Sequence, residues 1–116
     1  MFEVAAVRKT VTVCHCSQCR RLSGHLWAAT RALFDNLVFA KDEGLTWYAS
    51  SNFAKRGFCR CCGTSLFYRM NDEDGVGIGA GCLDMPTGLE ISQHIFCKDK
   101  GDYYDIDGDA LQLPTY

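Results

Sequence analysis

The sequence has no long apolar run, only two prolines and no concentration of basic charge. No apolar stretch approaches the roughly 18 residues that a membrane-spanning helix needs, so we expect no membrane partner. Residues 1–10 lack the basic start and long apolar run of a secretory signal, which makes the cytoplasm the expected compartment. The formal net charge is -2 and the basic residues are scattered, which argues against a nucleic-acid partner.

The chain also lacks any linker-like or repeated stretch at which it could be divided. Its length of 116 residues is typical of one domain of ordinary size. A chain of this length buries roughly two thirds of its unfolded surface, so it can form a core without covalent cross-links. We therefore expect residues 1–116 to form a single domain.

The sequence also lacks the pattern of a long amphipathic helix, because no stretch keeps a 3.6-residue apolar period over ten or more residues. Short apolar runs separated by turn residues, such as Asp35-Asn36 and Asp74-Gly75, dominate instead. We predict a mostly β fold of small antiparallel sheets, with short helical turns at residues 20–24 and near Tyr103. The expected strands span residues 11–13, 26–30, 37–40, 45–48, 53–58, 66–69, 76–80 and 94–97.

Cysteine, in contrast, is abundant, with eight residues. In an oxidising compartment these cysteines could pair as disulfides, whereas in a reducing one tight cysteine spacing indicates a metal site. The absence of a secretory signal favours metal. Cys82 and Cys97 stand alone in expected strands, where packing as small apolar residues is the better interpretation. The other six cysteines form two clusters.

The first cluster is Cys14-x-Cys16-x-x-Cys19. Two thiolates separated by two residues can bind one ion across a tight turn, with a Zn–S distance of about 2.3 Å. Cys16 and Cys19 fit this arrangement, and Cys14 adds a third sulfur from the preceding strand. Side chains alternate along a strand, so His15 is expected to point away from Cys14 and Cys16 and not to act as a ligand. The spacing therefore predicts a zinc site.

The second cluster is Cys59-x-x-Cys62-Gly63, a zinc-knuckle pattern in which Cys61 is an extra member. We expect Cys61 to be a bystander that can serve as a ligand if the site is incomplete. Both clusters could share one closed four-sulfur zinc. Alternatively, each cluster could hold its own ion, which would leave the first with an open fourth position and would give two zinc ions per chain. Structural zinc sites are closed and catalytic ones keep a position open, so the choice bears on function.

These clusters and their flanks resemble the family of glutathione-dependent formaldehyde-activating enzymes, which also contains centromere protein V. The resemblance implies the β-tent fold, an all-β arrangement of small antiparallel sheets around zinc. It rests on Cys14 to Gly24 with its Cys-His-Cys-Ser-Gln-Cys start, on Phe58-Cys59-x-x-Cys62-Gly63-Thr64-x-Leu66, and on Gly81-Cys82-Leu83-Asp84, His94-Ile95-Phe96 and Leu113-Pro114-x-Tyr116.

The resemblance further implies an open, catalytic zinc on Cys14, Cys16 and Cys19, and a structural zinc on Cys59 and Cys62. In the family, the remaining two ligands of the structural zinc come from a Cys-x-Cys-Gly motif near the N-terminus. No cysteine precedes Cys14 in this sequence, so the second site is expected to have two of its usual four ligands. An exposed first strand whose partner motif is missing would favour a homodimer.

The implied reaction is the condensation of glutathione, or a similar thiol, with formaldehyde or a related small aldehyde, which is a carbon–sulfur lyase-type activity. Arg20 and Arg21 could offset the charge of a zinc-bound thiolate or bind a glutathione carboxylate; a solvated surface pair is the equal alternative. His94 is the candidate for proton transfer, although a core histidine is the commoner outcome for such a position. The expected glutathione pocket comprises Ser23, Gly24 and Trp27.

Two other functions remain open at this stage. The same open zinc could hold glutathione as a carrier without accelerating any reaction. A purely structural zinc domain could instead mediate protein contacts, because a fold alone does not determine chemistry.

Overall fold

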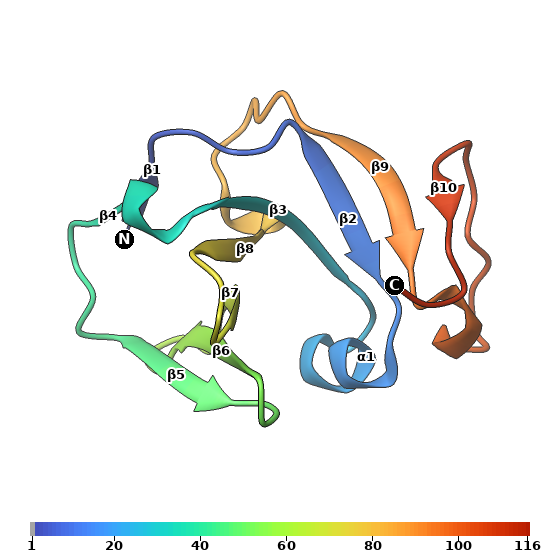
Figure 1. The fold of residues 1–116 in the computed structure, drawn as a ribbon, viewed down its shortest axis with the longest axis horizontal. Helices are drawn as coiled ribbons and strands as arrows, with labels where there is room; N and C mark the ends of the chain where they lie inside the picture. The colour runs from blue at the N-terminus through green and yellow to red at the C-terminus, as the bar shows by residue number, and fades with distance from the viewer. Residues whose placement is uncertain (1) are drawn as a thin grey trace.

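The computed structural model describes residues 2–116, and its fold is mostly β, which confirms the predicted class (Figure 1). The regular helix in this part of the chain is α1 (Ser17–Ser23), and short 3-10 turns span Phe34–Asn36, Ala80–Cys82 and Cys97–Asp99. The strands are β1 (Phe2–Val4), β2 (Thr10–Cys14), β3 (Trp27–Leu33), β4 (Leu37–Phe39), β5 (Leu45–Ala49), β6 (Ala54–Cys59), β7 (Ser65–Met70), β8 (Gly75–Gly79), β9 (Glu90–Ile95) and β10 (Leu111–Gln112).

Eight strands form one sheet in the order β10-β9-β2-β3-β8-β7-β6-β5, and β1 pairs separately with β4. Most neighbours are antiparallel, as expected. The exceptions are β2 with β9 and β9 with β10, which pair in parallel. Figure 1 shows β2 and β9 running side by side towards the C-terminal end of the chain. A parallel pair needs a long connection, and here most of the chain lies between β2 and β9.

Each expected strand overlaps an observed one, whereas the very short β1 and β10 were not predicted. The helical turn expected at residues 20–24 is part of α1, which ends at Gly24 in the left-handed conformation. The expectation that Cys82 and Cys97 lie in strands is wrong, because both belong to 3-10 turns. Phe96 adopts a positive φ of 55°, which ends the extended backbone before Cys97.

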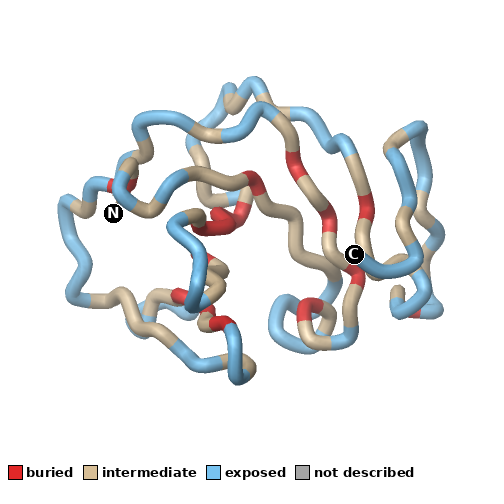
Figure 2. Tube along the Cα trace, in the orientation of Figure 1, coloured by how far each residue is buried: buried red, intermediate tan, exposed pale blue. Residues whose placement is uncertain are grey.

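The core lies where β7 and β8 face the β1–β4 pair. Phe67, Val76 and Ile78 are almost fully buried there, together with Leu37. The Trp47 ring stacks on Phe67 with ring centroids 5.9 Å apart. Burying a side chain of this size contributes about 1.5–3 kcal/mol, so these contacts fix the position of β7 and its neighbours. Figure 2 shows buried stretches on strands and on α1, while many of the connecting segments are exposed.

Among residues 2–116, no helix has the length and apolar character needed to cross a membrane.

Candidate metal centre

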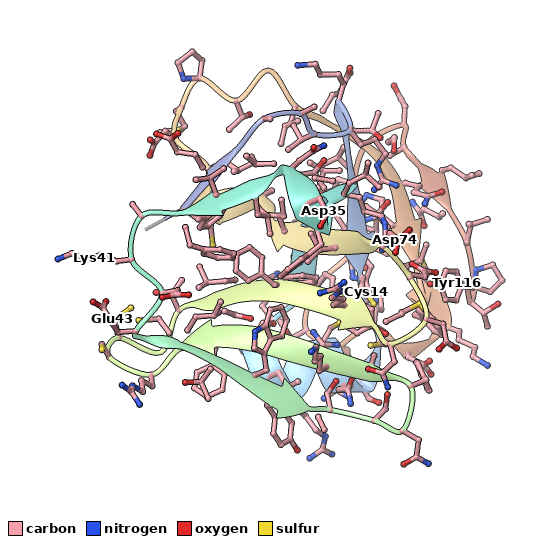
Figure 3. The ribbon with its side chains drawn as sticks, turned by 60° about the vertical axis from the view of Figure 1, so that its left-hand side comes forward. Cys14, Asp35, Lys41, Glu43, Asp74 and Tyr116 are labelled. Carbon is pink, nitrogen blue, oxygen red and sulfur yellow. The ribbon has the colours of Figure 1, made fainter. Side chains whose placement is uncertain are left out.

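Three cysteine sulfurs meet where β2 passes into α1. Cys14 is the last residue of β2, and Cys16 caps the N-terminus of α1, where its Sγ accepts a hydrogen bond from the Cys19 amide at 3.3 Å. The Sγ atoms of all three lie within 4.8 Å of one another. Cys19 is buried, and Cys14 and Cys16 are half-buried. Cys14 is seen inside the fold in Figure 3, and the group it forms with its two neighbours could hold a metal ion.

The pKa values of the clustered thiols are shifted in different directions. Hydrogen bonds from Cys14 and then Cys19 hold the pKa of Cys16 well below its usual value. The pKa of Cys14 is raised in turn, first by its hydrogen bond to Cys16. Cys16 is therefore the thiol that loses its proton more readily than Cys14. An all-sulfur donor set of this kind suits a soft or borderline ion such as Zn²⁺, and three ligands leave one tetrahedral position free.

The sulfurs lie in the wall of a cavity of about 290 Å³. Its apolar wall includes Trp27 and Ile95, and the exposed rings of Phe53 and Tyr116 also line it. Tyr116 lies at the periphery of the fold in Figure 3, and its ring packs edge-on against Phe96 with centroids 5.8 Å apart. Aromatic side chains thus form part of the cavity wall around the sulfur cluster.

Another part of the cavity wall is cationic, with Arg8, Arg31 and Arg56 all lining it. Arg31 pairs with Glu73 at 2.7 Å, and Arg8 donates to the Thr12 hydroxyl at 3.1 Å. Burial and the nearby Arg31 both lower the pKa of Arg8, so these two guanidinium groups are close enough to repel each other. Sequence reasoning missed all three arginines, because no local motif marks them and only the sheet order brings them together.

Arg56 contacts the sulfur cluster directly. It lies on β6 and is only 8% exposed. Its Nη2 donates to Gln18 Oε1 at 3.0 Å and to Cys19 Sγ at 3.5 Å. The guanidinium also packs over the rings of Tyr68 and Trp27, at 4.9 and 5.7 Å from their centroids. These contacts hold one positive charge against the buried sulfur.

Of the pocket residues expected from sequence, Trp27 lines this cavity. Among residues 2–116, the cavity wall includes neither Arg20, Arg21, Ser23 nor Gly24. Arg21 borders a separate, more open hollow. The Ser23 hydroxyl donates to the Cys19 carbonyl at 2.7 Å, so it is already hydrogen-bonded within α1. Binding roles for these four residues stay predictions.

The two buried histidines, His15 and His94, form a hydrogen-bonded group with Tyr104. His15 Nε2 and His94 Nδ1 are hydrogen-bonded at 2.9 Å, and His15 Nδ1 is hydrogen-bonded to the Tyr104 hydroxyl. Burial lowers the pKa of both histidines. Neither histidine lines the cavity within the described residues, so the part of His94 in proton transfer stays a prediction.

The second cysteine cluster spans the end of β6, where Cys59 lies, and the turn that leads to β7. The turn is closed by the Gly63 amide, which donates to the Cys59 carbonyl, and Gly63 has a positive φ of 79°. Cys62 Sγ lies 3.0 Å from the Thr64 hydroxyl, and hydrogen bonding to Thr64 and to Cys59 lowers the pKa of Cys62. Over residues 2–116, only the first cluster gathers three ligand atoms within 4.8 Å of one another. A second metal on Cys59 and Cys62 stays a prediction, and Cys61 is exposed beside them.

The chain is similar to known proteins in sequence and in fold. Residues 1–99 match the family model described as glutathione-dependent formaldehyde-activating enzyme. An uncharacterized lyase of Schizosaccharomyces pombe is 28% identical over 101 residues, which cover 83% of this chain and 70% of the relative. A crystal structure of a Rhodobacter sphaeroides protein is similar with a TM-score of 0.62 and 25% identity, covering 78% of this chain and 90% of that one.

Proposed function

This chain belongs to the glutathione-dependent formaldehyde-activating enzyme family, and on that premise we propose that it is a zinc-dependent carbon–sulfur lyase-type enzyme. It joins a small anionic thiol, glutathione or a close relative, to formaldehyde or a related small aldehyde. The observation that carries the proposal is the cavity of about 290 Å³, which has three clustered thiols and three arginines in the same wall.

The residues of the wall suit such a thiol. Its sulfur would lie at the Cys14, Cys16 and Cys19 group, and its carboxylates would lie against Arg8 and Arg31, since guanidinium groups bind carboxylates with paired hydrogen bonds. The aromatic side chains of the wall would exclude water from the reacting sulfur. A neutral thiol without carboxylates would lose the arginine contacts, so the proposal predicts selectivity for anionic thiols.

Bound zinc supplies Lewis acidity that favours the deprotonated form of an incoming thiol at neutral pH. In the addition step the thiol proton passes to solvent, the thiolate sulfur forms a bond to the carbonyl carbon, the C=O π pair moves to oxygen, and that oxygen takes a proton from solvent. Tyr68 lines the cavity, and burial raises its pKa, so its hydroxyl is protonated at neutral pH and can donate a hydrogen bond to that oxygen. Arg56 beside Cys19 offsets the accumulated negative charge.

The proposal is tested by measuring adduct formation from glutathione and formaldehyde with protein of known zinc content. We expect the wild-type protein to accelerate the reaction above its uncatalysed rate, and Cys16→Ser to lose both the acceleration and one equivalent of zinc. Cys97→Ser is the matched control, because Cys97 donates to the His94 carbonyl and lies outside the cavity wall. Wild-type protein that carries zinc but gives only the uncatalysed rate would contradict the enzymatic proposal.

One observation favours a second candidate, a thiol-binding or carrier module. Within the described residues the cavity wall contains no histidine, aspartate or glutamate, whose side chains most often move protons at neutral pH. A carrier needs only the sulfur cluster and the arginines. Saturable binding of glutathione to the zinc form without acceleration would establish this candidate in place of the enzyme.

A further inference from the structure

Arg56 is a buried cation without a carboxylate partner. It is 8% exposed, and among residues 2–116 it forms no ion pair with an aspartate or glutamate. Its Nε is buried and has no hydrogen-bond partner. A buried charge that is not compensated is strongly destabilising, so a stable fold requires an anion close to this guanidinium.

Arg56 instead contacts the sulfur cluster, whose thiols would lose their protons and become anionic on binding a divalent metal. Arg56 Nη2 donates to Cys19 Sγ at 3.5 Å, and the same atom donates to Gln18 Oε1 at 3.0 Å. Gln18 is itself fixed, because its Nε2 donates to the Ser50 carbonyl at 2.9 Å. A chain of hydrogen bonds thus runs from the end of β5 through Gln18 and Arg56 to the sulfur of Cys19.

Two aromatic rings complete the support. The guanidinium packs over Tyr68 and Trp27, whose negative ring faces favour a cation and restrict its position. Three side chains, those of Gln18, Tyr68 and Trp27, therefore hold Arg56 against Cys19. Such a supported contact is typical of groups that tune a metal site from outside its ligand set.

We infer that Arg56 is a positioning residue that balances the charge of the three-thiolate cluster and so favours an anionic thiol as the fourth ligand. Three thiolates around a divalent cation carry one net negative charge, which the guanidinium cancels. A fourth thiolate then brings the site to one negative charge instead of two. The inference rests on the proposed function in that it assumes a divalent metal at this cluster, but not that the protein is a catalyst.

Lysine should reproduce this role only in part. An ammonium group is a point charge, whereas Arg56 reaches Gln18 and Cys19 together and lies flat on the rings. Arg56→Lys keeps the charge but loses this geometry, and Arg56→Met keeps much of the volume but loses the charge. Comparing the two variants separates charge balance from packing.

The test measures zinc affinity by competition with a chelator, together with the absorption of the cobalt-loaded protein. We expect Arg56→Met to weaken metal binding by about ten- to hundredfold, the range typical of groups that support metal ligands, and Arg56→Lys to recover most of the loss. Arg69→Met is the matched control: Arg69 on β7 also stacks on a ring, 3.9 Å from the Phe34 centroid, but lies outside the cavity wall. Wild-type affinity and spectrum in Arg56→Met would overturn the inference.

If Arg56→Met does not fold, Gln18→Ala provides the same test, because it removes the acceptor that orients the guanidinium while leaving the charge in place. We expect a smaller loss of metal affinity in the same direction. Unchanged affinity in Gln18→Ala would show that this acceptor does not orient the guanidinium towards the metal ligands. The charge itself is then tested with Arg56→Gln, whose wild-type metal affinity would overturn the inference. Wild-type protein that binds no divalent metal would overturn it as well.

Thiol binding to the metal-loaded protein separates charge balance from direct recognition of substrate. We expect Arg56→Met to weaken binding of glutathione and of 2-mercaptoethanol, which has no carboxylate, by similar factors. A loss confined to glutathione would show that Arg56 binds a substrate carboxylate and would overturn the inference. A wild-type protein that binds thiols but does not accelerate adduct formation would contradict the proposed enzyme and leave this comparison intact.

Discussion

Gly57 on β6 is a position at which the packed core leaves little room for a side chain. It is buried, and a Cβ atom there would lie 3.0 Å from Phe67 Cδ2 and 3.1 Å from Trp47 Cζ3. Those two rings stack on each other, and Phe67 is only 1% exposed, so neither can move without disturbing the core. The glycine is therefore required by the close approach of two aromatic rings to the β6 backbone.

We predict that Gly57→Ala lowers the free energy of unfolding by about 1–3 kcal/mol, the usual cost of overpacking a core. Chemical denaturation monitored by tryptophan fluorescence measures the change. Gly81→Ala is the control, because a Cβ at Gly81 would have no atom within 4 Å and should change stability by less than about 0.5 kcal/mol. Equal stability of the two variants would contradict this account of the core.

Single residues also mark the limit of what could be predicted from sequence. The close approach of Cys14, Cys16 and Cys19 was predicted, because the spacing itself keeps three sulfurs within one strand end and one helical turn. Arg8 and Arg56 could not be assigned to the same cavity, because they are brought together only by the order of β2, β3, β8, β7 and β6 in the sheet. The residues next to Arg8 and Arg56 in the sequence do not indicate that the two side chains line one cavity.

At the scale of elements, β9 and the loop after β2 are held together through the buried histidines. His94 on β9 is hydrogen-bonded to His15, and His15 to Tyr104. The pKa of His94 lies below its ordinary value of 6.5 because burial disfavours the charged form. Other groups that bear on this pair are cationic or neutral, namely Lys100 and His25, so no nearby carboxylate among residues 2–116 offsets the effect.

The sign of the pH dependence follows from this lowered pKa. The unfolded chain binds a proton at His94 more readily than the folded protein does, so folding is favoured above pH 6.5 and loses stability as the pH falls below it. One such histidine gives a slope of at most about 1.4 kcal/mol per pH unit. The stability of the metal-loaded protein should therefore decrease from pH 7.5 to pH 5.

We predict that His94→Asn has lower stability at pH 7.5 but a flatter decline down to pH 5, measured by denaturation at fixed metal concentration. Protonation of the cysteines destabilises both proteins equally, so it cancels in the difference between the two curves. Parallel curves would mean that His94 does not contribute to the pH dependence.

The elements themselves were predicted better than their pairing. Strands β2 to β9 follow local apolar runs bounded by turn residues, so pattern reasoning located each of them. The parallel pairing of β2 with β9 was not foreseen, because it depends on contacts between distant segments. The end of β9 before Cys97 depends on the left-handed backbone of Phe96, which an aromatic residue does not signal.

At the scale of the whole molecule, the cavity is assembled from nearly the full length of the chain. Its wall includes Arg8 before β2, the cysteines at the start of α1, Arg56 on β6 and Tyr116 near the C-terminal end of β2 and β9 (Figure 1). Backbone hydrogen bonds from Phe96 and Cys97 to Thr115 and Leu113 hold the last residues in place. Binding at this site should therefore depend on the complete fold and not on the cysteine motif alone.

The measurement that tests the central claim most directly is a titration of the cobalt-loaded protein with glutathione, followed by sulfur-to-cobalt charge-transfer absorption. If Cys14, Cys16 and Cys19 form an open metal centre that receives a thiol, the absorption rises and saturates at one glutathione per responding cobalt. The same titration of Cys16→Ser gives no such rise. A spectrum that glutathione does not change, or one that responds equally in Cys16→Ser, would contradict the account.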